Sequence, residues 1–313
     1  MLKCPICNSL VHRQRFLCPA SFNYGAEHVL QECLDCGVTY FQPPPTLDQL
    51  NTFYLVEGYE FSRHSQEHRA RVIVRKHLRT TSQGAFLDIG CGTGYLLNEV
   101  RARTNWSVFG VELSPRACEF AKNSLKLDTI INSDLAGAQF KDGSFDVLHI
   151  SEVLEHVPSP LSFLTECRRI IKPDGTLLLS LPNGQSDRQG LLDFWKENAK
   201  PPGHASGHIY FFSSKSLRVL LAKTGFEIVS SQTYAFKQGL RSLGLFPKRK
   251  GGSGMYQPRS TVEKENKKVV ENPGAKHSDA YFRIRYGLRD LVSIPGMHRP
   301  GHAFRLVVRP VGN

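Results

Sequence analysis

The sequence predicts an α/β protein whose main domain is a doubly wound, mostly parallel sheet, preceded by a small cysteine-rich unit. From residue 85 onward, short apolar runs alternate with segments of helical spacing. Because parallel neighbouring strands need crossover connections, this alternation indicates a parallel sheet with helices on its faces. A glycine-rich turn follows the first apolar run, and two Cys-x-x-Cys pairs stand within the first 36 residues.

The chain has 313 residues, enough for one large domain and a smaller unit. Residues 1–45 hold five of the eight cysteines and end in three consecutive prolines, which break regular structure. We therefore expect a small unit over 1–45, a helical linker over 46–82 and the α/β domain over 83–313. Residues 236–301 are expected to be an insertion between the last two strands of that domain.

The expected elements alternate as a parallel sheet requires. Ser114 before Pro115 is a strong helix start, because serine caps a helix and proline suits its first turn. Helices are expected over residues 95–103, from residue 115, over 160–171 and over 213–224. Strands are expected over residues 86–89, 108–112, 129–131, 145–150, 175–181, 226–234 and 302–310.

Composition places the chain among ordinary globular proteins. Apolar residues make up 40% of the sequence and charged residues 22%. No apolar run approaches the ~18 residues that cross a bilayer, and the first residues do not resemble a secretory signal. We expect a cytoplasmic protein without a membrane partner, whose reduced cysteines bind metal rather than form disulfides.

The net charge of +12 is partly local. Residues 247–278 contain eight lysines and arginines against three glutamates, in a stretch rich in glycine, serine, proline and asparagine. This composition is typical of a solvated loop. A nucleic-acid partner therefore stays open but is not favoured, and the sequence leaves the oligomeric state undetermined.

The strongest motif is the turn Phe86-Leu-Asp-Ile-Gly-Cys-Gly-Thr-Gly-Tyr95. Its glycines remove side chains where a ligand must approach the backbone, and the following helix offers unpaired N–H groups. Dinucleotide enzymes use the spacing G-x-G-x-x-G, whereas here the spacing is G-x-G-x-G. Asp88, two residues before the first glycine, would repel a pyrophosphate and would suit an amino group.

Two further acids are expected at the same edge of the sheet. Glu112 ends the second strand, 22 residues after Gly90, where an acid can accept both hydroxyls of a ribose. Asp134 follows the third strand and could accept an adenine amino group. Open α/β sheets bind ligands at the carboxyl ends of their strands, so these acids are expected to face one ligand.

These residues closely resemble the class I S-adenosylmethionine-dependent methyltransferase family. Further landmarks are Asp146, the segment Ser151-Glu-Val-Leu-Glu-His156 and the segment Ile170-Ile-Lys-Pro-Asp-Gly-Thr176. The resemblance implies a Rossmann-like, seven-stranded sheet with an antiparallel last strand, with S-adenosylmethionine as the cofactor. It implies cofactor contacts from Asp88, Gly90, Cys91, Gly92, Gly94, Glu112, Leu113, Asp134, Leu135, Ser151 and Glu152.

The four N-terminal cysteines Cys4, Cys7, Cys33 and Cys36 form two Cys-x-x-Cys pairs, 25 residues apart. Four thiolates satisfy tetrahedral Zn²⁺ and leave no open coordination position, so we expect a structural zinc ribbon. The alternative is four unrelated reduced cysteines; Cys18, between the pairs, is expected to pack. The arrangement resembles a bacterial branch of the same family in which a zinc ribbon precedes the catalytic domain.

His208 is the expected catalytic base or acceptor-orienting group, because its segment is similar to that of small-molecule O-methyltransferases. His156 and Glu155 are the next candidates. The pattern Glu152-x-x-Glu155-His156 also resembles a metal site in some family members, where a further histidine completes it. A divalent metal at the acceptor site is therefore a second cofactor candidate beside the structural zinc.

The favoured function is methyl transfer to a small-molecule acceptor, with a hydroxyl oxygen as the favoured acceptor atom. RNA methylation through the zinc ribbon and a basic surface is an alternative, as is C-methylation of a sugar. A non-catalytic, cofactor-binding scaffold is the alternative from another class. The identity of the acceptor lies beyond the sequence.

Overall fold

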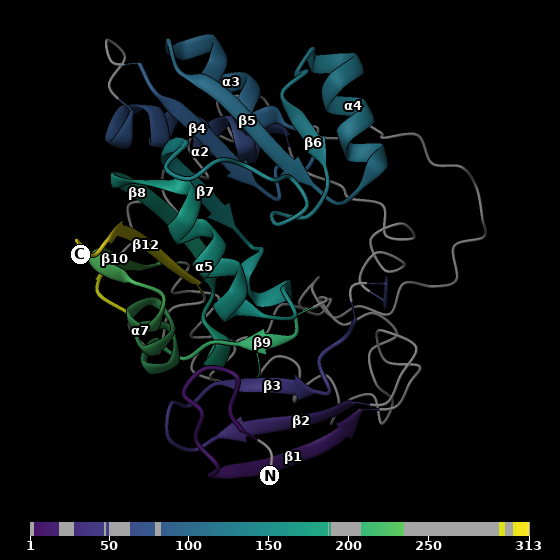
Figure 1. Cartoon of the computed structure of the whole chain (residues 1–313), viewed down its shortest axis with the longest axis vertical. Helices are drawn as coiled ribbons and strands as arrows, with labels where there is room; N and C mark the ends of the chain where they lie inside the picture. Colours follow the sequence, from purple (N-terminus) through teal and green to yellow (C-terminus); the bar gives the residue numbers. More distant parts are fainter. Residues whose placement is uncertain are drawn as a thin grey trace, which may run out of the picture.

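A computed structural model gives the fold of the chain (Figure 1). It describes residues 3–18, 28–46, 48–49, 63–78, 83–186, 188, 208–234, 294–297 and 303–312. The expected basic loop over 247–278 lies outside the described residues, as do about half of the linker over 46–82 and most of the insertion over 236–301. The proposed division of the chain at residues 45 and 82 therefore stays a prediction.

The main sheet has the strand order β11-β10-β12-β8-β7-β4-β5-β6. The five strands from β8 to β6 pair in parallel, and β12 runs antiparallel between β8 and β10. The strands are β4 (Ala85–Ile89), β5 (Ser107–Glu112), β6 (Ile130–Asn132), β7 (Phe145–Ser151), β8 (Ile171–Pro182), β10 (Phe226–Tyr234), β11 (Ile294–Pro295) and β12 (Ala303–Pro310).

Seven of these strands confirm the expected sheet, including the antiparallel last strand β12. The two-residue strand β11 extends this sheet by pairing with β10 at its edge. Thr233 Oγ1 donates a hydrogen bond to the Gly296 carbonyl at 2.7 Å, which fastens this short strand to the edge.

The helices are α2 (Arg63–His77), α3 (Tyr95–Arg103), α4 (Pro115–Leu125), α5 (Pro160–Ile170) and α7 (Ser214–Lys223). Ser114 caps α4 as expected, its Oγ accepting from the Ala117 N–H at 3.3 Å. Ser213 caps α7 in the same way. None of the described helices is long and apolar enough to cross a membrane.

Side chains of the central strands alternate between the two faces of the sheet, so each face has its own hydrophobic core. Phe86, Val147 and Leu178 pack with α2, α3 and α4 on one face. Their neighbours in the chain, such as Leu87 and Leu148, pack with α5 and α7 on the other. This is the doubly wound arrangement, and it leaves the carboxyl ends of the parallel strands as the edge for a ligand.

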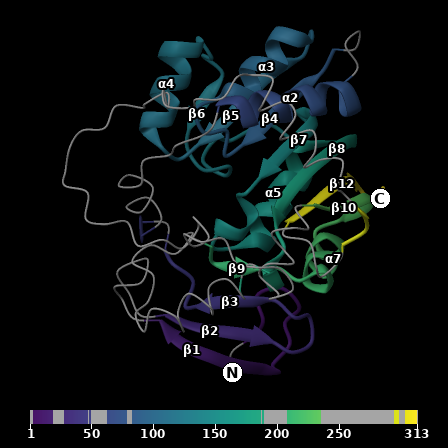
Figure 2. The ribbon, with the colours of Figure 1, turned by 180° about the vertical axis from the view of Figure 1, so that it is seen from behind.

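A second sheet of four antiparallel strands has the order β1-β2-β3-β9. It lies at one end of the molecule, with α3 and α4 at the other (Figures 1 and 2). Its strands are β1 (His12–Cys18), β2 (His28–Cys33), β3 (Thr39–Gln42) and β9 (Tyr210–Phe211). The fourth strand thus comes from the α/β part of the chain. Residues 3–18 and 28–42, called the ribbon below, share a hydrophobic core with α5 and α7.

Candidate functional site

The glycine turn joins β4 to α3, and all three glycines adopt positive φ angles. The values are 73° at Gly90, 54° at Gly92 and 79° at Gly94. A Cβ atom on Gly90 would lie 2.5 Å from the Cγ2 atom of Val153, and one on Gly94 would lie 2.8 Å from Leu127 Cδ1. Glycine is therefore required here by both conformation and space.

Glu112 is the last residue of β5, and its carboxylate holds the glycine turn through hydrogen bonds. One of its carboxylate oxygens accepts from the Gly92 N–H at 2.9 Å, and the other accepts from the Ser114 N–H at 2.8 Å. The residue is only 8% exposed, and burial raises the pKa of its carboxyl group in spite of these hydrogen bonds. Each oxygen keeps a lone pair for a further donor, such as a ribose hydroxyl.

Asp88 is buried in β4 and has a partner that the sequence reasoning missed. Its Oδ1 lies 2.6 Å from Nδ1 of His149, which is also buried. The His149 ring stacks on Phe86, with the ring centroids 6.2 Å apart. Because β4 and β7 pair with Asp88 opposite His149, the histidine holds the carboxylate in place. No local motif marks this contact, which joins residues 61 positions apart.

The third acid, Asp134, lies half-buried in the loop after β6. Its Oδ1 accepts from the Gly137 N–H at 2.7 Å, and the side chain of the neighbouring Leu135 is buried. Asn132 ties this edge to β5, because its Nδ2 donates to the carbonyls of Glu112 and Leu113 at 2.9 and 3.0 Å. Leu113 and Asp134 therefore belong to adjacent strand ends.

The two remaining cofactor candidates lie at the end of β7 and differ in their surroundings. Ser151 accepts hydrogen bonds from Arg69 of α2 and from Ser180 of β8, the latter at 2.8 Å. Glu152 is exposed and has a φ of 58°. Since Ile89 pairs with Ile150, Ser151 stands beside the start of the glycine turn. The sequence reasoning missed Arg69, which brings a guanidinium group to this edge.

Cys91 contributes its backbone rather than its thiol to the turn. The side chain is 2% exposed and belongs to the core on the face of α3. Burial raises the pKa of the Cys91 thiol well above its ordinary value, so it is not a nucleophile.

The three catalytic candidates come together. Glu155 Oε1 lies 3.9 Å from His208 Nε2 and 4.0 Å from His156 Nε2. The two histidine rings meet edge to face, with centroids 4.7 Å apart. Glu155 and His208 are buried, and one ligand atom from each of the three residues lies within 4.8 Å of the others. The cluster uses Glu155 from the short 3-10 helix Leu154–His156, and Glu152 stands outside that helix.

Backbone hydrogen bonds tie the neighbour of His208 to the 3-10 helix and to β3. This neighbour, Ile209, donates to the Glu155 carbonyl at 2.8 Å and accepts from the Phe41 N–H of β3 at 3.1 Å. Ser213 Oγ donates to the carbonyl of Cys36 at 2.8 Å. The ribbon therefore positions the segment that carries the candidate base.

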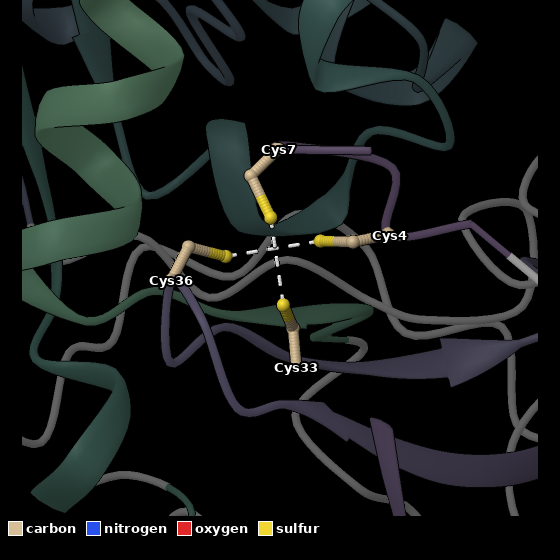
Figure 3. Close-up of side chains that lie close together, drawn as sticks. All are labelled: Cys4, Cys7, Cys33 and Cys36. Carbon is tan, nitrogen blue, oxygen red and sulfur yellow. Dashed lines mark hydrogen bonds between the residues drawn. The ribbon is translucent and has the colours of Figure 1, made fainter. Parts of the chain in front are cut away.

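The four ribbon cysteines point at a common centre (Figure 3). The Cys4 and Cys36 sulfurs are 3.7 Å apart, and those of Cys7 and Cys33 are 3.5 Å apart. A tetrahedral zinc ion with bonds of about 2.3 Å separates its sulfurs by about 3.8 Å. The described cysteines are all free thiols, so these four residues fit the zinc that the sequence predicts.

The thiols interact strongly with one another. The hydrogen bond from Cys36 lowers the pKa of Cys4 to about 5, and the same bond raises the pKa of Cys36. One of the four thiols therefore loses its proton readily, and a cation at the centre would favour deprotonation of the other three. The side chain of Cys18 lies outside the described residues.

A match to a known protein family covers the part of the chain that holds this site. A family model described as a methyltransferase domain matches residues 63–231. The chain belongs to the S-adenosylmethionine-dependent methyltransferase family. The match spans α2 to β10, and so includes the glycine turn, the three acids and the cluster of Glu155, His156 and His208.

Curated relatives match a shorter part of the chain. The ubiquinone biosynthesis O-methyltransferase of Xanthomonas campestris is 41% identical over 104 residues, 31% of this chain and 42% of the relative. The mitochondrial ubiquinone biosynthesis O-methyltransferase of Schizosaccharomyces pombe is 44% identical over 101 residues, 30% of this chain and 36% of the relative. The chain thus spans less than half the length of these relatives.

Among solved structures, an S-adenosylmethionine-dependent methyltransferase of Thermotoga maritima aligns with a TM-score of 0.47 and 20% identity. The alignment covers 79% of this chain and 91% of that chain.

Proposed function

We propose that the protein transfers the methyl group of S-adenosylmethionine to a hydroxyl oxygen of a small molecule. The observation that carries the proposal is that the glycine turn and the cluster of Glu155, His156 and His208, of which Glu155 and His208 are buried, lie at the carboxyl ends of neighbouring strands. The relatives named O-methyltransferases support oxygen as the acceptor atom. The cofactor would supply a methyl group on a positively charged sulfur.

The residues of the turn have complementary tasks. The ionised Glu112 accepts the ribose hydroxyls, and Asp134 with Leu113 and Leu135 borders the adenine. Asp88, held by His149, accepts from the amino group directly or through water. Arg69, anchored on Ser151, offers its guanidinium group to the carboxylate of the methionyl part. The backbone of the turn contacts the cofactor at Gly90, Cys91, Gly92 and Gly94. Glu152 lies at the exposed rim of the site.

His208 is the proposed base. A neutral ring nitrogen takes the proton from the acceptor hydroxyl as the oxygen forms its bond to the methyl carbon. The buried carboxylate of Glu155, 3.9 Å away, favours the positive charge that His208 then carries. His156 packs against the ring of His208 and orients it. Methyl transfer otherwise depends on alignment of the two reactants and exclusion of water.

Glu155, His156 and His208 also fit a divalent cation. Carboxylate and imidazole atoms are common ligands of such ions, and these three are close enough for small side-chain rotations to bring them onto one ion. A bound ion would lower the pKa of an acceptor hydroxyl by polarising its oxygen. In that case His208 is a ligand, and another group takes the proton.

The ribbon zinc is proposed to be structural, because four cysteines fill a tetrahedral ion. The reducing cytoplasm stays the proposed compartment, which agrees with free thiols at every cysteine whose side chain the structure describes. A small-molecule acceptor is proposed over RNA because Glu155 and His208 are buried and His156 is only partly exposed.

Calorimetric titration with S-adenosylhomocysteine tests the cofactor assignment, and Glu112→Ala is the variant expected to lose binding. Incubation with S-adenosylmethionine and a metabolite extract, followed by mass spectrometry, tests the transfer. We expect one small molecule to gain the mass of a methylene group, and His208→Ala to abolish that gain while cofactor binding persists. A methylated RNA with no methylated small molecule would contradict the proposal.

A further inference from the structure

Three arginines converge on one glutamate of the four-stranded sheet. Arg188 donates to Glu32 Oε1 at 3.1 Å, and Arg13 donates to Glu32 Oε2 at 2.8 Å. Arg15 forms an ion pair with the same Oε2 atom. Arg188 also donates to Thr39 Oγ1 at 3.2 Å. Arg188 belongs to the segment after β8, whereas the other residues belong to the ribbon strands β1, β2 and β3.

The charges of this arginine cluster do not balance. Glu32 lies among three guanidinium groups, and arginine keeps its positive charge in proteins. Among the described residues, Glu32 is the one acid that these arginines pair with, so two of the three positive charges are left uncompensated there.

Two hydrogen-bond donors of the arginine cluster are also unmatched among the described residues. Within the described part of the chain, the buried Nε–H groups of Arg15 and Arg188 have no acceptor. Buried donors without an acceptor are costly, so the cluster favours an additional anion. The Arg13 side chain is 54% exposed, which leaves an approach from solvent.

The strand register places the arginine cluster on the face that leads to His208. Arg13 pairs with Glu32, Glu32 with Thr39, and Thr39 with Phe211, so the four side chains project from one face of the sheet. With strands about 4.8 Å apart, Glu32 and Phe211 are separated by about 10 Å. The Phe211 ring lies 6.4 Å from that of His208.

We propose that Arg13, Arg15 and Arg188 bind an anionic group of the methyl acceptor, a phosphate or a carboxylate, while its hydroxyl lies at His208. The proposal rests on the proposed function and adds the substrate class. Guanidinium groups bind both anions through paired hydrogen bonds, so the two share one recognition chemistry. The acceptor is thus an elongated anion whose negative group and reacting hydroxyl are about 10 Å or more apart.

Titration of the zinc-loaded full chain with inorganic pyrophosphate, and separately with benzoate, tests this assignment and distinguishes the two anions. We expect saturable binding of one of them at low salt. Arg188→Gln and Arg15→Gln should each weaken it about tenfold, the loss of one charge-assisted hydrogen bond. Glu32→Gln should strengthen binding, because it removes the competing carboxylate; a purely structural ion pair would not give this gain.

Arg103→Gln is the matched control, because Arg103 pairs with Glu99 on α3 and lies outside both sites. Every variant is also titrated with S-adenosylhomocysteine, which reports an intact cofactor end. Failure of both anions to bind, or equal binding by wild type, Arg15→Gln and Arg188→Gln, overturns the anion site while cofactor binding stands. Failure of the wild type to bind S-adenosylhomocysteine overturns the proposed function instead.

Discussion

The buried side chain of Glu112 has a structural role in the fold and a proposed role in binding the cofactor. Its two oxygens accept backbone N–H groups from the glycine turn and from the start of α4, so the carboxylate is oriented before any cofactor arrives. The same burial raises the pKa of that carboxyl group. Cofactor affinity should therefore depend on pH through this residue.

We expect S-adenosylhomocysteine to bind more weakly as the pH falls, because protonation of Glu112 removes an acceptor from the ribose hydroxyls. The loss should begin above the ordinary glutamate value of 4.5, since the folded-state pKa is raised. Glu112→Gln should bind more weakly at neutral pH and lose this pH dependence. Calorimetric titrations across a pH series measure both effects; identical pH profiles for the two proteins would contradict the assignment.

Gly90→Ala is expected to destabilise the fold by about 1–3 kcal/mol and to weaken S-adenosylhomocysteine binding, because it adds both strain and a clash. The clash is with Val153, 2.5 Å from the added methyl group, and the strain comes from a φ of 73°. The double variant Gly90→Ala with Val153→Ala should recover only the part of the lost stability that is due to the clash. Denaturant unfolding separates these contributions, with Val153→Ala alone as the control; full recovery would show that φ is unimportant.

At this scale the sequence allowed prediction of residues whose role is local. Gly90 and Glu112 stand at fixed distances from a strand end, and their chemistry can be inferred from that spacing. His149 and Arg69 could not be identified, because their partners Asp88 and Ser151 lie 61 and 82 residues away. Only the strand register and the packing of α2 bring them to the site.

The element that most affects the site is β9, a two-residue strand shared between the ribbon and the catalytic part of the chain. Tyr40 and Tyr210 stack across the β3–β9 pair with centroids 6.1 Å apart, and both are buried. The two Cys-x-x-Cys pairs allowed prediction of the ribbon, but the strands β1 to β3 were not predicted. Arg13 of β1 and Glu32 of β2 meet only when these two strands pair.

Removal of zinc with a chelator should loosen β9 before it affects the cofactor turn. We expect faster hydrogen exchange in peptides over residues 208–213 and unchanged exchange over 86–94, with S-adenosylhomocysteine affinity retained. Cys33→Ser should reproduce this pattern. Cys167→Ala, at a buried cysteine outside the ribbon, is the control; equal loosening of both peptides in the zinc-free protein would contradict the coupling.

At the scale of the whole molecule, the ribbon and one face of the main sheet form one hydrophobic core. Ile6 and Val38 of the ribbon belong to the same buried cluster as Ile170 of α5 and Leu220 of α7. The parallel sheet and its strand order were predictable from alternating elements and the family resemblance. The edge strand β11 was not, because two residues within a long insertion carry no periodicity that marks a strand.

Because the core is shared, zinc-loaded protein should unfold in one thermal transition. Ile6→Val and Ile170→Val remove the same group from two fully buried positions, one in the ribbon and one in α5. Each should destabilise that single transition by about 0.5–1.5 kcal/mol. Scanning calorimetry measures it; a separate low-temperature transition that responds only to Ile6→Val would show an independently folding ribbon.

The shared sheet also sets an order of events during synthesis. Tyr210 follows Gln42 by 168 residues, and a ribosome that adds about 5–20 residues per second needs on the order of 10–30 s to make them. The cysteines therefore leave the ribosome well before β9, and the sheet around them gains its last strand only after β9 has been made. During that interval the outer edge of β3 is unpaired in the nascent chain, and an early metal ion is what could hold it in shape.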